Sequence, residues 1–99
     1  MRLENLRRDD PFKNRDLVSV VTDPDGGCTL WIRRVRNHGS DEIPDWKDVV
    51  EGDYDPFCTY PDIEKITRED EDGEYSYWHT PLRFRKFVSL LKEEGWQIY

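Results

Sequence analysis

Two pairs of β-branched and aromatic runs, each pair divided by turn-forming residues, dominate the hydrophobic pattern of the chain. The first pair occupies residues 17–21 and 29–35, and the separator at 23–27 reads Asp-Pro-Asp-Gly-Gly. Proline fixes φ, and the glycines can take the positive φ that tight turns need. The pattern therefore predicts a β-hairpin over residues 17–36.

A second pair of runs lies at 63–68 and 74–78, on either side of the charged sequence Glu-Asp-Glu-Asp-Gly. These runs favour a second hairpin over residues 62–79, with the charged sequence at its tip. Ile63 and Ile66 lie three positions apart, which is also a helical spacing. A helix therefore remains the alternative for the first of these two runs.

Near the end of the chain, apolar side chains recur at the spacing of one helix face, at Phe84, Phe87, Val88 and Leu91. Thr80 is suited to the N-cap, Pro81 to the first helical position and Gly95 to the C-terminal stop. The segment 80–95 is therefore predicted to be an amphipathic helix.

The last four residues, 96–99, are short and apolar and are predicted to add a closing strand to the sheet. Because an exposed strand edge can pair with another chain, this strand is also the place where a homodimer could form. At the other end, residues 1–16 mix both signs of charge and contain Pro11, which indicates an arm or a short helix. Residues 37–61 are expected to form an acidic loop with a short helix at 44–51.

The predicted fold is thus α+β: a single small domain over residues 1–99. Its antiparallel sheet of about four to five strands packs against one C-terminal helix. A long acidic loop and a short helix connect the two hairpins.

Composition adds that the core must be thin and aromatic. Hydrophobic residues make up 35% of the chain, charged residues make up 37%, and alanine is absent. Thirteen aromatic side chains, each able to bury roughly 150 to 250 Å², compensate for the scarcity of aliphatic ones. No apolar run approaches the roughly 20 residues of a membrane span, so we expect a soluble cytoplasmic protein. Cys28 and Cys58 belong to no CxxC pair and are expected to be free thiols.

Charge is distributed unevenly along the chain. Residues 37–79 contain fourteen carboxylates and three basic side chains, a local charge of −11 in a protein whose total is −7. The segments on either side are therefore mildly basic. Such an imbalance bears on partners and association rates more than on fold.

Catalytic chemistry is not indicated. A serine or cysteine hydrolase needs a general base, and the side chains of suitable pKa are those of His38 and His79. Neither histidine lies in a known catalytic sequence motif. His79 follows Trp78 at the junction with the predicted helix, where packing or a hydrogen bond explains it. We therefore expect no enzyme activity.

Metal or cofactor binding is not expected either. Two short sequences resemble the opening of a calcium loop, one at Asp23, Asp25 and Gly26 and one at Asp70, Asp72 and Gly73. A calcium loop of the EF-hand type needs about twelve residues between two helices, whereas these sequences lie between strand-like runs. Hairpin turns explain both, and the cysteines and histidines have no zinc-ligand spacing.

The acidic segment leads to the main functional hypothesis, a non-enzymatic protein-interaction module that binds and occludes a basic surface of a partner. Aromatic side chains among carboxylates suit such a surface, because the carboxylates steer a basic partner and the rings anchor it. Small acidic inhibitors of nucleic-acid-handling machinery, of the phage counter-defence type, share this composition. The candidate partner-binding residues are Glu42, Asp45, Trp46, Asp48, Glu51, Asp53, Tyr54, Asp55, Glu69, Asp70, Glu71 and Asp72.

The alternative hypothesis is a nucleic-acid-binding accessory domain. Basic groups alternate with aromatic rings on the predicted strand and helix, as they do in proteins that bind single strands. The net charge of −7 opposes direct contact with a polyanion, so nucleic acid is the less favoured partner. The residues concerned are Trp31, Arg33, Arg34, Arg36, Arg83, Arg85 and Lys86. If these cations instead pair with the acidic segment, that segment is neutralised from within.

Overall fold

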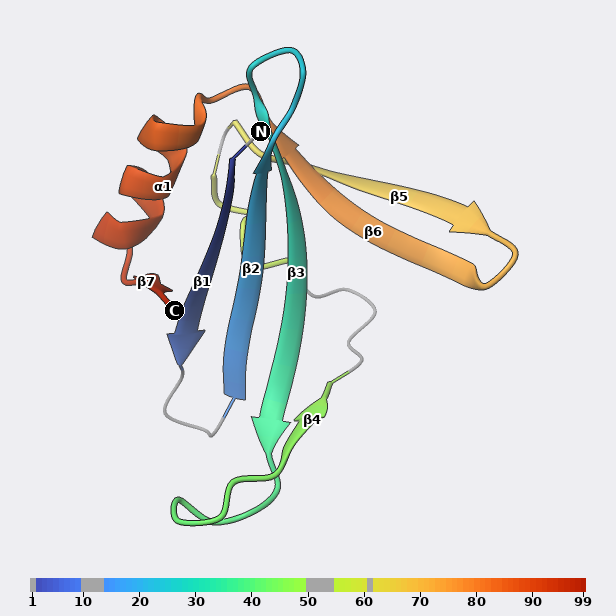
Figure 1. Ribbon diagram of the computed structural model, residues 1–99. Coiled ribbons are helices and arrows are strands. Elements are labelled where there is room, and N and C mark those ends of the chain that lie inside the picture. The colour runs from blue at the N-terminus through green and yellow to red at the C-terminus, as the bar shows by residue number, and fades with distance from the viewer. Residues whose placement is uncertain (1, 10–13, 50–54, 61) are drawn as a thin grey trace.

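The computed structural model describes residues 2–9, 14–49, 55–60 and 62–99, and within them it contains seven strands and one helix. In chain order these are β1 (Leu3–Asp9), β2 (Asn14–Thr22), β3 (Cys28–Asn37), β4 (Trp46–Asp48), β5 (Glu64–Asp70), β6 (Gly73–Thr80), α1 (Phe84–Glu93) and β7 (Gln97–Ile98). They form one antiparallel sheet in the order β5-β6-β3-β2-β1-β7, and β4 pairs with β3 (Figure 1). The α+β class is confirmed in this coarse form, although the sheet has more strands than expected.

Both predicted hairpins are present. The β2–β3 turn closes with hydrogen bonds from Asp23 N to Gly27 O at 2.9 Å and from Gly26 N to Asp23 O at 3.0 Å. Gly26 has a φ of +94°, which a side chain would disfavour. In the second hairpin, Asp70 lies opposite Gly73, and the helical alternative for residues 63–68 is therefore wrong.

Two expectations for the first half of the chain are wrong. Leu3–Asp9 is not an arm or a short helix, because it forms β1 and pairs with β2 from Leu3 opposite Val21 to Asp9 opposite Arg15. Within the short helix expected at 44–51, Trp46–Asp48 is instead strand β4 against the end of β3, and residues 50 and 51 lie outside the described residues. The Asn37 side chain fixes that loop by accepting hydrogen bonds from the backbone of Gly39 and Asp45. Strand pairing overrides local helix signals in both places.

The C-terminal helix starts later than its capping residues predict. Thr80 is a fully buried member of β6 opposite Cys28, and its hydroxyl accepts a hydrogen bond from the backbone of Leu82. The helix begins at Phe84, and Arg83 is its extended N-cap residue. Gly95, with a φ of +96°, follows the helix as predicted.

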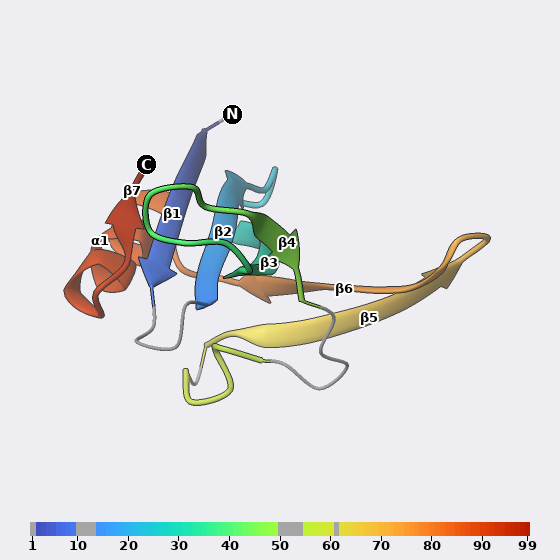
Figure 2. The same cartoon turned by 90° about the horizontal axis from the view of Figure 1, so that it is seen from below.

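The core lies on one face of the sheet. Its aromatic members come from separate segments: Phe57 packs on Trp96 at 5.8 Å and on Phe87 at 6.5 Å between ring centroids. Figure 2 shows α1 and the segment that leads into β5 on the same side of the sheet. The cluster of buried residues is Leu6, Val18, Val20, Cys28, Leu30, Phe57, Trp78, Phe87, Val88, Leu91 and Trp96.

The described part of the chain contains no helix that is long and apolar enough to cross a membrane. Cys28 is buried and Cys58 is exposed, and both thiols are free, as expected.

Candidate protein-interaction surface

The second hairpin separates from the sheet and projects into solvent. β3 is joined to β6 at three residue pairs, of which the last is Leu30 opposite Trp78. From there β6 runs back to Gly73 alongside β5, five further residues or roughly 16 Å of strand. The two views show this hairpin arm, residues 66–77, pointing away from β1, β2 and β3 (Figures 1 and 2).

An aromatic cluster of Trp31, Tyr75 and Tyr77 lies at the base of the hairpin arm. The ring centroids of Trp31 and Tyr77 are 5.2 Å apart, and those of Tyr75 and Tyr77 are 6.4 Å apart. Trp31 lies in β3, one residue beyond the last β3–β6 pair. Its contact with Tyr77 therefore packs the base of the arm against the sheet. Trp31 is nevertheless 47% exposed and Tyr75 is 40% exposed. These large apolar surfaces face solvent.

The tip of the arm is acidic. Residues 68–74 contain five carboxylates and one cation, Arg68, and so carry a charge of −4. All five are exposed, and within the described part of the chain none forms an ion pair. Glu69 lies directly opposite Glu74 across the hairpin, an arrangement of like charges that destabilises a sheet. The tip carboxylates are Glu69, Asp70, Glu71, Asp72 and Glu74.

The acidic residues around β4 are partly neutralised. Asp48 forms an ion pair with Arg33, and this pairing raises the pKa of the Arg33 guanidinium. Asp45 lies 3.6 Å from the Lys47 ammonium. Of the predicted anchors, Trp46 lies beneath the Arg15 guanidinium, 4.3 Å from its ring centroid. Ion pairs between exposed groups are worth only about 0 to 1 kcal/mol, so they remain open to exchange with a partner.

Asp55 belongs to the fold. Its Oδ1 accepts hydrogen bonds from Trp78 Nε1 at 2.9 Å and from the backbone of Phe57 at 3.0 Å. Both partners are buried core residues, so one oxygen of this half-buried carboxylate is engaged within the fold. Glu42 is exposed in the loop before β4, and the remaining predicted residues, Glu51, Asp53 and Tyr54, lie outside the described residues.

The basic residues of the alternative hypothesis do not gather on one surface. Trp31 and Arg33 are exposed on the face of the sheet away from the core. Arg34 alternates to the core face, where it binds the buried carboxylate of Asp16. The others are spread between the end of β3, the β2–β3 turn and the exposed side of α1, at Arg36, Arg83, Arg85 and Lys86.

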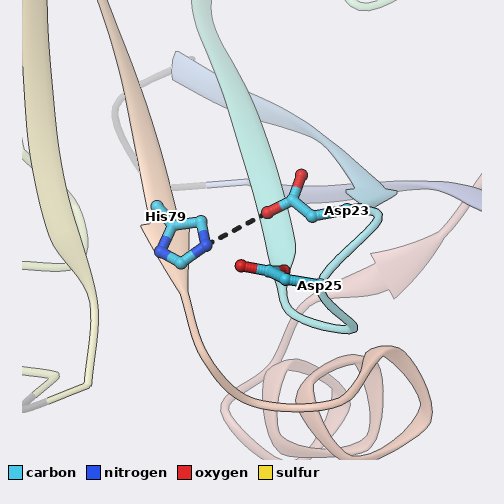
Figure 3. Close-up of side chains that lie close together, drawn as sticks. All are labelled: Asp23, Asp25 and His79. Atoms are coloured by element: carbon cyan, nitrogen blue, oxygen red, sulfur yellow. Dashed lines mark ion pairs between the residues drawn. The ribbon is translucent and has the colours of Figure 1, made fainter.

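The structure also assembles a group that no local sequence pattern indicates. His79 Nε2 lies 3.1 Å from Asp23 Oδ2, and Asp25 lies beside them in the β2–β3 turn (Figure 3). The turn expected from Asp23 and Asp25 is confirmed, but the approach of His79 depends on its pairing with Thr29, fifty positions earlier. The aromatic cluster was missed for the same reason, although Tyr75 and Tyr77 alternate as one strand face requires.

Comparisons with models of known protein families, with curated proteins and with solved structures gave no match. Functional proposals for this chain therefore rest on its own geometry and chemistry.

Proposed function

We propose that the protein is a non-enzymatic interaction module that presents the hairpin arm to a basic surface of a partner protein. The observation that carries this proposal is the tip of the arm, where five exposed carboxylates extend away from the rest of the domain. The arm reaches beyond the sheet, so a partner can contact it from several sides without meeting the core.

Electrostatics favour a basic partner. Glu69 and Glu74 face each other across the hairpin, and the described residues supply no counter-ion to either. A lysine or arginine from a partner would relieve this repulsion on binding. Exposed charge of one sign also accelerates association with a surface of the opposite sign.

The aromatic cluster also suits a protein partner. Trp and Tyr are among the residue types that dominate protein interfaces, and here Tyr75 and Tyr77 lie on the arm and Trp31 lies on β3 beside its base. Trp31 and Tyr75 offer exposed ring surface, and the Tyr77 ring lies against both, with centroids 5.2 Å from Trp31 and 6.4 Å from Tyr75. We therefore assign the steering role to the tip and the anchoring role to the rings.

The surface that such an arm would occlude is one rich in arginine and lysine. Proteins that handle nucleic acids carry surfaces of this kind, because phosphate contacts dominate their affinity. Inhibition by occlusion of a nucleic-acid-binding surface is thus the activity we propose.

A set of neutral variants at the tip tests the role of the arm. The tip variant combines Glu69→Gln, Asp70→Asn, Glu71→Gln and Asp72→Asn. Asn at position 70 keeps the oxygen that accepts the Asp72 backbone hydrogen bond, so the turn is preserved. A matched control removes four exposed carboxylates elsewhere, through Asp41→Asn, Asp62→Asn, Glu93→Gln and Glu94→Gln.

Each variant is immobilised, exposed to an extract of the native host and eluted with increasing salt, and the retained proteins are quantified by mass spectrometry. A basic protein retained by the wild type and the control but lost from the tip variant is the expected result. Equal retention by the tip variant contradicts the proposal. Addition of a DNA oligonucleotide should displace the retained partner, and a partner that stays bound would show that a different surface is covered.

Direct nucleic-acid binding has one observation in its favour, the exposed rings of Trp31 and Tyr75, on which bases could stack. Against it, Arg33 is paired with Asp48, and Arg34 is tied to Asp16 on the opposite face. A gel-shift assay with a single-stranded oligonucleotide at low salt separates the two functions. We expect no shift at micromolar protein, and a shift that weakens steeply with salt would favour nucleic acid instead.

A further inference from the structure

Asp23, Asp25 and His79 converge where the hairpin arm joins the sheet (Figure 3). The two aspartates belong to the β2–β3 turn, whereas His79 lies in β6 opposite Thr29. One donor atom from each side chain lies within 4.8 Å of the others, and His79 Nε2 is 3.1 Å from Asp23 Oδ2. Two separate elements therefore supply one nitrogen and two oxygen donors to the same point.

The fold orients each carboxylate through one of its oxygens. Asp23 Oδ1 accepts a hydrogen bond of 2.6 Å from the Thr29 hydroxyl, and Asp25 Oδ1 accepts one of 3.0 Å from the Gly27 amide. In metal sites, hydrogen bonds of this kind hold the ligating side chains in the orientation that binds the ion. The second oxygen of Asp23 faces His79, and among the described residues the second oxygen of Asp25 has no hydrogen-bond partner.

Gly27 keeps the space beside these donors open. A Cβ atom at this position would lie 3.3 Å from His79 Nε2, 3.4 Å from Asp25 Oδ1 and 2.6 Å from the Thr80 carbonyl oxygen. His79 Nε2 and one oxygen of Asp25 therefore border a space beside Gly27 that a side chain at this position would fill.

We propose that Asp23, Asp25 and His79 bind a divalent first-row transition ion, with Zn²⁺ as the probe, and that water completes its coordination. An imidazole ligand favours zinc and its neighbours over magnesium and calcium, which prefer oxygen. Two carboxylates offset the charge of the ion. Donors about 2.1 Å from zinc lie about 3.0 to 3.4 Å apart, which the His79–Asp23 separation already satisfies. Asp25, whose donor atom lies within 4.8 Å of the other two, would be the third ligand.

Charges from every neighbouring element act on this point. The two aspartates make the potential at this point negative. The pKa of the nearby Cys28 thiol is raised to about 11, mainly by burial and in addition by the negative charges of Asp23 and Asp25. Glu64 of β5 lies opposite His79, and the Arg83 guanidinium lies against Gly26 on the turn.

Calorimetric titration of the metal-free protein with Zn²⁺ tests the site, and the imidazole resonances of the two histidines report where the ion binds. We expect one Zn²⁺ per chain at neutral pH, with shifts at His79 and none at His38. His79→Gln and Asp25→Asn should each weaken binding by at least about 10-fold. Asn at position 25 keeps the oxygen that accepts the Gly27 hydrogen bond, so the turn survives in this variant.

Matched controls are His38→Gln and Asp62→Asn, which alter an exposed histidine and an exposed carboxylate outside the site. Both should bind Zn²⁺ as the wild type does. The proposal is overturned if the wild type shows no saturable binding up to about 1 mM Zn²⁺. It is equally overturned if Asp25→Asn and His79→Gln, shown to be folded by circular dichroism, retain the wild-type affinity.

Discussion

Arg34 Nε donates a hydrogen bond of 2.8 Å to Asp16 Oδ1, and Asp16 is only 4% exposed. The Arg8 guanidinium approaches the other carboxylate oxygen at 3.7 Å, from the neighbouring strand β1. Arg8 also lies over the ring of Trp96, 4.5 Å from its centroid. The buried carboxylate of Asp16 therefore lies between two cations on the core face of the sheet, and Arg34 stabilises the fold by neutralising it.

Replacement of Asp16 by alanine should unfold the protein far more easily than an exposed substitution does. Removing one partner of a buried ion pair leaves uncompensated charge and typically costs about 3 to 5 kcal/mol. Denaturant unfolding of Asp16→Ala should show a loss of this size. Asp41→Ala, at an exposed position, should change stability by no more than about 0.5 kcal/mol. Similar unfolding midpoints for the two variants would contradict this role of Asp16.

Asp55 should stabilise the fold by accepting the hydrogen bond of Trp78, and its negative charge should not be needed for that role. Asp55→Ala leaves the buried Trp78 Nε1 without its hydrogen bond and should lower the free energy of unfolding by about 1 to 3 kcal/mol. Asp55→Asn retains the acceptor oxygen and should recover most of that loss. Denaturant unfolding compares the two variants, and equal destabilisation would mean that the charge itself is required.

The aromatic cluster should be energetically coupled. A double-mutant cycle of Trp31→Ala and Tyr77→Ala should give a coupling energy of about 0.5 to 1.5 kcal/mol, because their rings are in contact. Trp46 interacts with Arg15 at β4 and provides the comparison. The cycle of Trp46→Ala with Tyr77→Ala should give a value near zero. Coupling of the same size in both cycles would indicate a general loss of structure.

The two cysteines should differ sharply in reactivity. Burial, with help from Asp23 and Asp25, raises the pKa of Cys28 from 9.0 to about 11, whereas Cys58 is exposed. At mildly alkaline pH, iodoacetamide should therefore modify Cys58 first, as peptide mass spectrometry would show. In denaturant both should react equally, and equal rates in the native protein would contradict the burial of Cys28.

The raised pKa of Cys28 also predicts a loss of stability at high pH. The folded state holds the thiol proton more tightly than the unfolded chain does. This contribution is therefore complete below pH 9.0 and is lost as pH rises from 9.0 to about 11. In Cys28→Ala the unfolding free energy should decline less over that interval than in the wild type.

The elements that the sequence predicts well are those set by neighbouring residues. The β2–β3 turn follows from Pro24 and its glycines, and the helix face follows from the spacing of Phe84, Phe87, Val88 and Leu91. The elements that it misplaces depend on strand pairing, which local patterns do not reveal. β1 exists because it pairs with β2, and Thr80 stays in β6 because Cys28 lies opposite.

The residues of the candidate interaction surface also differ in whether local sequence predicts their position. Glu69 to Asp72 are adjacent in sequence, so their display at a hairpin tip could be predicted from turn chemistry. Asp55 could not be distinguished from them, because its Trp78 partner lies 23 positions away. Likewise, the separation of Arg33 from Arg34 onto opposite faces follows from strand alternation once β3 is placed.

Because β3 and β6 are joined over a short stretch only, a small rotation at their junction moves the tip of the hairpin arm over a larger distance. The arm is fixed by three residue pairs at one end and extends roughly 16 Å beyond the last of them. A tilt of about 10° at those pairs would displace the tip by about 3 Å over that length. The position of the acidic tip in space is thus governed by a small area of the sheet, which includes His79.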